Sequence, residues 1–162
     1  MNKEGNVECR MGYLFLIAGI FFGDLRIKNY VEKSFPEEGE WKKKDGLLRL
    51  RKHYNRGAFL NAGQENRRAV AALSVCLTFF VLALFVASLG TKGNRALRTG
   101  LAMLLGGAFS NTYDRCRRKY VVDYFSFGVK CKGLSRIVFN ISDFGIILGA
   151  LTAALAAGNG GK

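Results

Sequence analysis

The feature that most constrains the fold of this chain is a run of 22 residues without a charge, AVAALSVCLTFFVLALFVASLG at 69–90. A helix needs about 20 apolar residues to cross the hydrocarbon core of a bilayer, so this run is long enough. Residues 137–158 form a second run of equal length, in which Asp143 is the only charged residue. Two such runs in a chain of single-domain length predict a membrane protein.

Two shorter uncharged stretches complete the predicted set of helices. The stretch at 11–23 has 13 residues, and no small-residue cleavage site follows it, so we interpret it as a membrane helix and not as a signal peptide. The stretch at 100–113 becomes long enough if its helix begins near residue 96. We therefore predict an all-α membrane protein, one integral-membrane domain over residues 1–162, with four transmembrane helices at about 11–28, 69–90, 96–114 and 137–158.

The polar connections at about 29–68 and 115–136 are predicted to be extracytoplasmic. Within the first, LLRLRKHY alternates, with Leu48 and Leu50 on one side and Arg49 and Arg51 on the other. Alternation with period two predicts a half-buried strand. Because a lone hairpin is only marginally stable, we expect a small β element at the membrane surface, supported by the helices or by lipid.

The net charge of +13 would indicate a nucleic-acid partner in a soluble protein. Here the basic residues flank apolar runs and no nucleic-acid-binding motif is present, so we predict no nucleic acid and instead an anionic phospholipid surface, met in part by the lysines at 42–44. The four cysteines lack metal-ligand spacing, and no metal or cofactor is predicted. Cys116 and Cys131 share one connection and form either a disulfide or two free thiols.

The strongest indication of chemistry is Asp143, because a carboxylate at membrane depth costs roughly 2.5–3.5 kcal/mol and usually marks a functional site. Asp123 follows YVV in what we predict to be the loop before the last helix. Two carboxylates at one membrane face predict acid–base chemistry by a pair that shares a proton.

Helical spacing brings further polar residues to the same membrane end. The residues that share a helix face are Gly107, Asn111, Asp114 and Arg115 in the third helix, Asn140 and Asp143 in the fourth, and Asp24 and Lys28 in the first. Each also has a simpler interpretation. Asp24–Lys28 and Asp114–Arg115 can be structural ion pairs, Gly107 a close-packing position, and Asn55 a turn residue.

Taken in order, these residues resemble the lipoprotein signal peptidases, the signal peptidase II family. The resemblance runs from Asp24 to Asp143, most of the chain. Its elements are Asp24 with Lys28, NRGAF at 55–59, GGAFSNTYDR at 106–115, VVDY around Asp123, and FNISD at 139–143.

This resemblance implies a multi-pass aspartic endopeptidase of the bacterial cytoplasmic (inner) membrane, with its active site at the extracytoplasmic face. It would use no cofactor and would remove the signal peptide of prolipoproteins just before a cysteine that carries diacylglyceryl. The implied catalytic residues are Asp123 and Asp143; the implied substrate-binding residues are Asn55, Gly57, Asn111, Arg115 and Asn140; Asp24, Lys28, Gly107 and Asp114 are implied to be structural. The oligomeric state is not fixed by the sequence, and we expect a monomer.

Three observations depart from the family pattern or from general rules. Lys119 stands where the family usually has glycine, so we expect a different turn there. Ser142 stands where alanine is commoner. The predicted outer connections at 24–68 and 114–136 carry twelve and seven basic residues against six on the inner side, which opposes the positive-inside rule. Two alternatives stay open: an inactive paralogue that binds lipopeptide or lipid, and a small membrane transporter.

Overall fold

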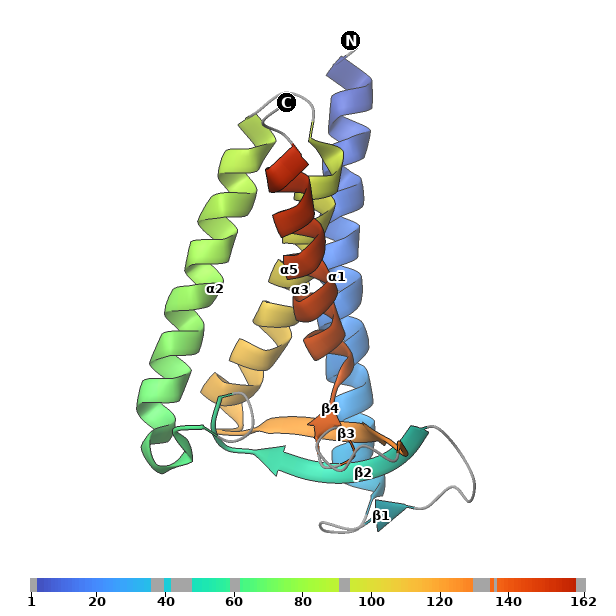
Figure 1. The fold of residues 1–162 in the computed structure, drawn as a ribbon, viewed down its shortest axis with the longest axis vertical. Coiled ribbons are helices and arrows are strands. Elements are labelled where there is room, and N and C mark those ends of the chain that lie inside the picture. The colour runs from blue at the N-terminus through green and yellow to red at the C-terminus, as the bar shows by residue number, and fades with distance from the viewer. Residues whose placement is uncertain are drawn as a thin grey trace.

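The computed structural model describes residues 3–35, 40–41, 48–58, 62–90, 94–129, 135 and 137–159. Long helices lie side by side, and a small sheet lies across one of their ends (Figure 1). The helices are α1 (Lys3–Ser34), α2 (Arg67–Gly90), preceded by the 3-10 turn η2 (Gln64–Asn66), α3 (Arg95–Arg117) and α5 (Ile141–Asn159). The strands are β1 (Glu40–Trp41), β2 (Leu48–Asn55), β3 (Val121–Phe127) and β4 (Val138–Phe139).

The helices match the four predicted segments, with corrected bounds. α1 extends the predicted 11–28 at both ends and includes residues 3–10, which contain no proline to stop a helix. α5 begins at Ile141, because residues 138–139 join the sheet as β4. Within the described residues, two helices are long and apolar enough to cross a membrane, Gln64–Gly90 and Ile141–Gly158.

α3 packs against α1, α2 and α5. Its approach to α5 is so close that side chains are excluded at three glycines, Gly100, Gly107 and Gly149, and the approach is closest at the last two. A Cβ atom on Gly107 would lie 2.4 Å from the carbonyl oxygen of Ser142, and one on Gly149 would lie 2.4 Å from the backbone nitrogen of Leu104. Glycine is therefore required at both positions, and α5 begins directly against α3.

The sheet has the antiparallel order β1-β2-β3-β4, and it confirms the predicted strand at Leu48–Asn55. β3 corrects the prediction for Asp123, which lies in a strand and not in a loop. Leu50 pairs with Phe125 and His53 pairs with Asp123, so one extra residue of β2 is accommodated between these pairs. Such a bulge reverses the alternation. His53 therefore shares the face of Asp123, and Leu48 and Leu50 on that face are 54% and 44% exposed.

The opposite face of the sheet covers the end of α1. Val122 and Tyr124 pack with Val31 there. Lys52 is also buried on this side, and its ammonium donates to the carbonyl oxygens of Glu32 at 3.0 Å and Phe35 at 3.1 Å. The sheet is thus anchored on α1 through one face, which leaves its other face free to form part of a site.

The turn from α3 into β3 contains Lys119 with a φ of 71°. The backbone N–H groups of Arg118 and Lys119 both donate to the carbonyl oxygen of Asp114, at 2.7 and 3.1 Å, which closes α3 with the left-handed turn that glycine usually supplies. The expectation of a different turn was therefore wrong. The lysine adopts the left-handed angle, at a cost of about 1–2 kcal/mol.

Some predictions concern residues outside this description. The lysines at 42–44 and Cys131 lie outside the described residues. Cys116 is an exposed free thiol, so the disulfide alternative is not realised at this residue.

Candidate active site

Asp123 and Asp143 meet through one shared residue, Asn140. The Asn140 amide nitrogen donates to Oδ1 of Asp123 at 2.7 Å. The Asn140 backbone nitrogen donates to Oδ2 of Asp143 at 3.0 Å, and the Asp143 backbone nitrogen returns a hydrogen bond to Oδ1 of Asn140 at 2.9 Å. This reciprocal pair is a capping box at the start of α5, so the same contacts that begin the helix also fix the Asp143 carboxylate.

Burial dominates the environment of Asp123, whose residue is 3% exposed. Loss of solvent and the nearby charge of Asp143 raise the pKa of Asp123 from 3.8 to about 8, although hydrogen bonds from Asn140 and Asn55 and the charge of Lys28 act in the opposite direction. Asp123 is therefore a carboxyl that holds a proton near neutral pH.

Asn111 on α3 supports the second carboxylate. Its amide nitrogen donates to Oδ1 of Asp143 at 2.9 Å. Its amide oxygen accepts from the Lys28 ammonium at 2.9 Å and from the Asn140 amide at 3.3 Å. Asp143 thus accepts hydrogen bonds on both oxygens and lies in the first turn of α5.

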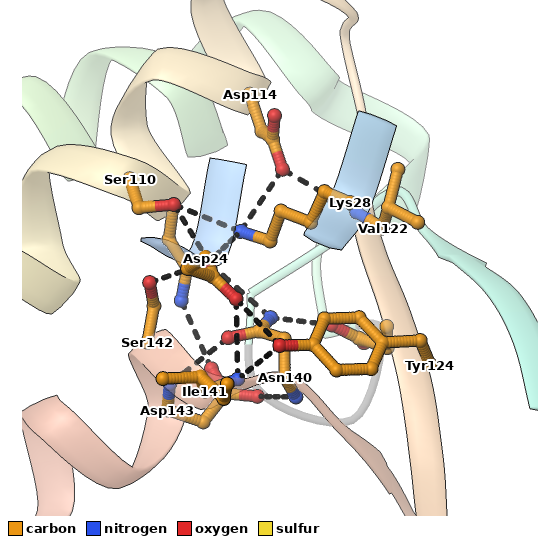
Figure 2. Close-up of polar contacts among 12 residues, drawn as sticks. Asp24, Lys28, Ser110, Asp114, Val122, Tyr124, Asn140, Ile141, Ser142 and Asp143 are labelled. Atoms are coloured by element: carbon orange, nitrogen blue, oxygen red, sulfur yellow. Dashed lines mark hydrogen bonds and ion pairs between the residues drawn. The ribbon is translucent and has the colours of Figure 1, made fainter. Parts of the chain in front are cut away.

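A buried network lies next to Asn140 and Asp143 (Figure 2). The Lys28 ammonium lies 2.7 Å from Asp24 and 3.1 Å from Asp114, and all three side chains are fully buried. Asp24 also accepts from the hydroxyls of Ser110, Ser142 and Tyr124, at 2.7, 2.6 and 2.9 Å, and from the Ile141 backbone nitrogen at 3.2 Å. The network therefore joins α1, α3, β3 and α5.

Arg115 connects the site to the segment that follows β2. Its guanidinium donates to the carbonyl oxygens of Gly57 at 3.1 Å and Asn111 at 3.4 Å, and the Gly57 nitrogen donates to the Asn55 side chain at 3.2 Å. Arg115 also interacts electrostatically with Asp123 and Asp143. Its buried Nε has no hydrogen-bond partner. A cationic donor without a partner beside two carboxyl groups is available to a polar atom of a bound substrate.

The structure brings all the predicted site residues into this one region. Asn111, Asn140 and Asn55 contact the two aspartates; Arg115 holds Gly57; Asp24, Lys28 and Asp114 form the network; Gly107 permits the contact of α3 with α5. The predicted pairing of Asp114 with Arg115 is replaced, because Asp114 pairs with Lys28 and with Arg118 at 3.3 Å.

Sequence reasoning missed four residues of the region. Ser110 lies three residues after Gly107 and four before Asp114, so the helical spacing already used could have identified it. Ser142 was noticed only as a departure from alanine. Tyr124 and His53 were missed because their roles depend on the sheet: Tyr124 reaches Asp24 from the α1 side, and His53 pairs across the strands with Asp123.

The fold of this chain is similar to that of two solved structures. Two solved structures described as bacterial membrane enzymes match it with TM-scores of 0.77 and 0.72, each covering 90% of this chain and 87% and 92% of the other, at 18% identity. The comparison of sequences identifies the family. The profile described as signal peptidase (SPase) II matches residues 16–157. The chain therefore belongs to the signal peptidase II family.

Individual relatives agree with this assignment. A lipoprotein signal peptidase of Oleidesulfovibrio alaskensis is 30% identical over 151 residues, covering 91% of this chain and 95% of the relative. A lipoprotein signal peptidase of Mesorhizobium japonicum is 30% identical over 141 residues, covering 85% of this chain and 80% of the relative.

Proposed function

We propose that this chain is a lipoprotein signal peptidase: an aspartic endopeptidase that cleaves prolipoproteins just before a cysteine that carries diacylglyceryl. The observation that carries the proposal is the contact of Asn140 with both Asp123 and Asp143 in a family member. Two carboxyl groups held by one amide residue can divide the work of peptide hydrolysis, one as a base and one as an acid.

We infer the role of each group from its environment. Two such carboxyl groups share one proton, and since Asp123 holds it, Asp143 is the base, with its oxygens fixed by Asn111 and the Asn140 backbone, and it takes a proton from the attacking water. Asp123 is the protonated acid, because burial raises its pKa to about 8, and it donates a hydrogen bond to the scissile carbonyl. Water adds to the carbonyl carbon, and the proton removed from it later passes to the leaving nitrogen. The free Nε of Arg115 stabilises the oxyanion or holds the peptide backbone.

We place the protein in the bacterial inner membrane with four spans. α2 and α5 are apolar enough to cross, and α1 and α3 lie beside them (Figure 1). The sheet end, which holds the aspartates, faces the extracytoplasmic side, because the cleavage site of a translocated precursor arrives there. The basic excess of this side then meets anionic headgroups, which offsets its conflict with the positive-inside rule.

The test is cleavage by purified protein in detergent of a synthetic prolipoprotein peptide, with and without the diacylglyceryl group. We expect the lipidated peptide to be strongly preferred, because each buried methylene contributes about 0.8 kcal/mol. Asp123→Asn and Asp143→Asn should each reduce kcat by at least about 10²-fold, since an amide cannot act as base or acid. Retention of more than a tenth of the activity by either variant would remove that residue from the pair.

The same assay separates the alternatives. Wild-type protein that binds the lipopeptide and leaves it intact would be a lipopeptide-binding paralogue. Equal cleavage of lipidated and unlipidated peptide would contradict the proposed substrate class.

A further inference from the structure

Lys28 makes more contacts than an ion pair requires. Its ammonium has three N–H donors and lies within reach of four acceptors: Asp24 at 2.7 Å, Asn111 at 2.9 Å, Asp114 at 3.1 Å and Ser110 at 3.1 Å. The two carboxylates alone would satisfy its charge. The contact with Asn111 differs from the others, because Asn111 in turn donates to Asp143 in the active site.

This contact determines which way the Asn111 amide points. An ammonium can donate only to the amide oxygen, so the amide nitrogen is directed to Asp143. If the amide were reversed, its NH2 group would face the Lys28 ammonium and the NH2 group of Asn140, and its oxygen would face a carboxylate. All three contacts would then be unfavourable.

The effect extends to the other aspartate. The Asn140 amide nitrogen donates both to Oδ1 of Asn111 at 3.3 Å and to Oδ1 of Asp123 at 2.7 Å. An Asn111 oxygen fixed by Lys28 therefore also draws the Asn140 NH2 group toward the position from which it reaches Asp123. One buried cation on α1 thus orders two amides, and each amide holds one aspartate.

We propose that Lys28 is a positioning residue for the reaction, which acts through Asn111 to orient the amides that hold Asp143 and Asp123. This inference rests on the proposed function and assigns to Lys28 a role beyond that of a structural ion pair. Its charge also reaches Asp123 directly, since Lys28 is among the groups that oppose the rise in the Asp123 pKa.

The charged and titratable groups around Lys28 are defined on every side. Asp24 lies on its own helix, Asp114 on α3, and Tyr124 on β3 in contact with Asp24. Asp123 and Asp143 lie beyond the amides, and Arg118 pairs with the other oxygen of Asp114 at 3.3 Å. Arg115 is the second cation that acts on both aspartates. Loss of the Lys28 charge therefore leaves the aspartates among more negative neighbours.

The chain offers a matched control in Lys52. This lysine is also buried and donates to the carbonyl oxygens of Glu32 on α1 and of Phe35 just after it, but it lies on the sheet face opposite Asp123. We would compare Lys28→Met with Lys52→Met in the lipopeptide assay. Lys28→Met should lower kcat about 10²-fold, the loss that a misplacement near 1 Å can cause, with KM changed less than about threefold. Its acid limb of the pH–rate profile should move to higher pH. Lys52→Met should change neither kcat nor the position of the acid limb.

Two further variants keep the test decisive. If Lys28→Met fails to fold because Asp24 and Asp114 lose their shared cation, the pair Asp24→Asn/Lys28→Met removes both charges together and leaves no donor toward Asn111, and its kcat should still fall. In an Asn111→Ala background, Lys28→Met should lower kcat much less than in the wild type, because the amide through which Lys28 acts is already absent. The proposal would be overturned if the kcat losses of Lys28→Met and Asn111→Ala simply multiplied in the double variant. It would also be overturned if Lys28→Met had the same kcat and pH–rate profile as Lys52→Met. Wild-type turnover in the same assay tests the peptidase function separately.

Discussion

α2 and α3 are neighbours of nearly equal length with opposite characters. α2 has 24 residues and buries only Val70, Thr78, Phe85 and Ser88, while its large apolar side chains point outward. α3 has 23 residues and buries nine, among them Ser110, Asn111 and Asp114. The helix that is most easily recognised as a membrane span therefore contributes least to the site, and the helix whose apolar character is interrupted by polar residues carries most of it. In a bilayer, polar side chains are retained where they face protein partners.

Glycines give the sharpest test of this contrast. Gly107→Ala on α3 would place Cβ 2.4 Å from the Ser142 carbonyl, one residue before Asp143, and the backbones would have to separate. We expect a loss of activity on the order of 10²-fold and a lower Tm. Gly90→Ala on α2 has nothing within 4 Å of the new Cβ and should leave both unchanged. Lipopeptide cleavage and thermal melting measure the two effects. Equal losses of activity and Tm in the two variants would contradict the difference between α2 and α3.

Asp123, whose charge interacts with Arg115 on the polar side of α3, should lower the stability of the folded protein at high pH. Because the folded pKa of Asp123 is about 8 and the ordinary value is 3.8, the folded protein keeps a proton that the unfolded chain releases. The stability that the folded protein gains by keeping this proton is fully present below about pH 4 and is lost as the pH rises toward 8. Asp123→Asn should therefore stabilise the protein at pH 8, by on the order of a few kcal/mol, and change little at pH 4. Unfolding at the two pH values measures this, and a variant no more stable at pH 8 would show that burial costs Asp123 nothing.

Two left-handed residues, one before α2 and one after α3, predict smaller and opposite effects. Lys119 has a φ of 71° and Gly63 a φ of 72°. Lys119→Gly should stabilise the protein by about 1 kcal/mol, and Gly63→Ala should destabilise it by a similar amount. Chemical denaturation would detect both changes. A Lys119→Gly variant that is less stable would mean that the hydrogen bond from the Lys119 ammonium to the Cys116 carbonyl oxygen outweighs the backbone strain.

The smallest expected effect compares two hydroxyls on α3. Thr112 meets Thr78 of α2 at 2.8 Å, whereas Ser110 donates to Asp24 in the buried network. Thr112→Val should cost about 0.6 kcal/mol of stability and leave cleavage within about twofold, since interhelical hydrogen bonds of this kind are weak. Ser110→Ala should reduce cleavage more, because Asp24 and Lys28 both lose a partner. The ratio of the two rates is the measurement, and a ratio near one would contradict the division between the two sides of α3.

The predictable parts of the molecule were those governed by local spacing. Uncharged runs located α2 and α5, and the i, i+3 and i+4 pattern located Asn111 and Asp114. Strand alternation located β2, but it could not reveal the bulge that places His53 and not Lys52 opposite Asp123, because a bulge depends on the partner strand. Asp123 was assigned to a loop for the same reason. The Asn140 capping box was readable in principle, since Asn140 stands three residues before Asp143 ahead of an apolar run.

The capping box has a consequence for biosynthesis. Asn140 and Asp143 lie at the start of α5, whereas Asp123, Asn111 and Lys28 come earlier in the chain and are therefore made first. A nascent chain that has reached β3 holds Asp123 but lacks Asn140 and Asp143, so the proposed aspartate pair cannot yet form. The pair is completed when the first turn of α5 packs against Gly107 of α3. Under the proposed function, a chain in the membrane that lacks α5 is therefore unable to cleave neighbouring proteins.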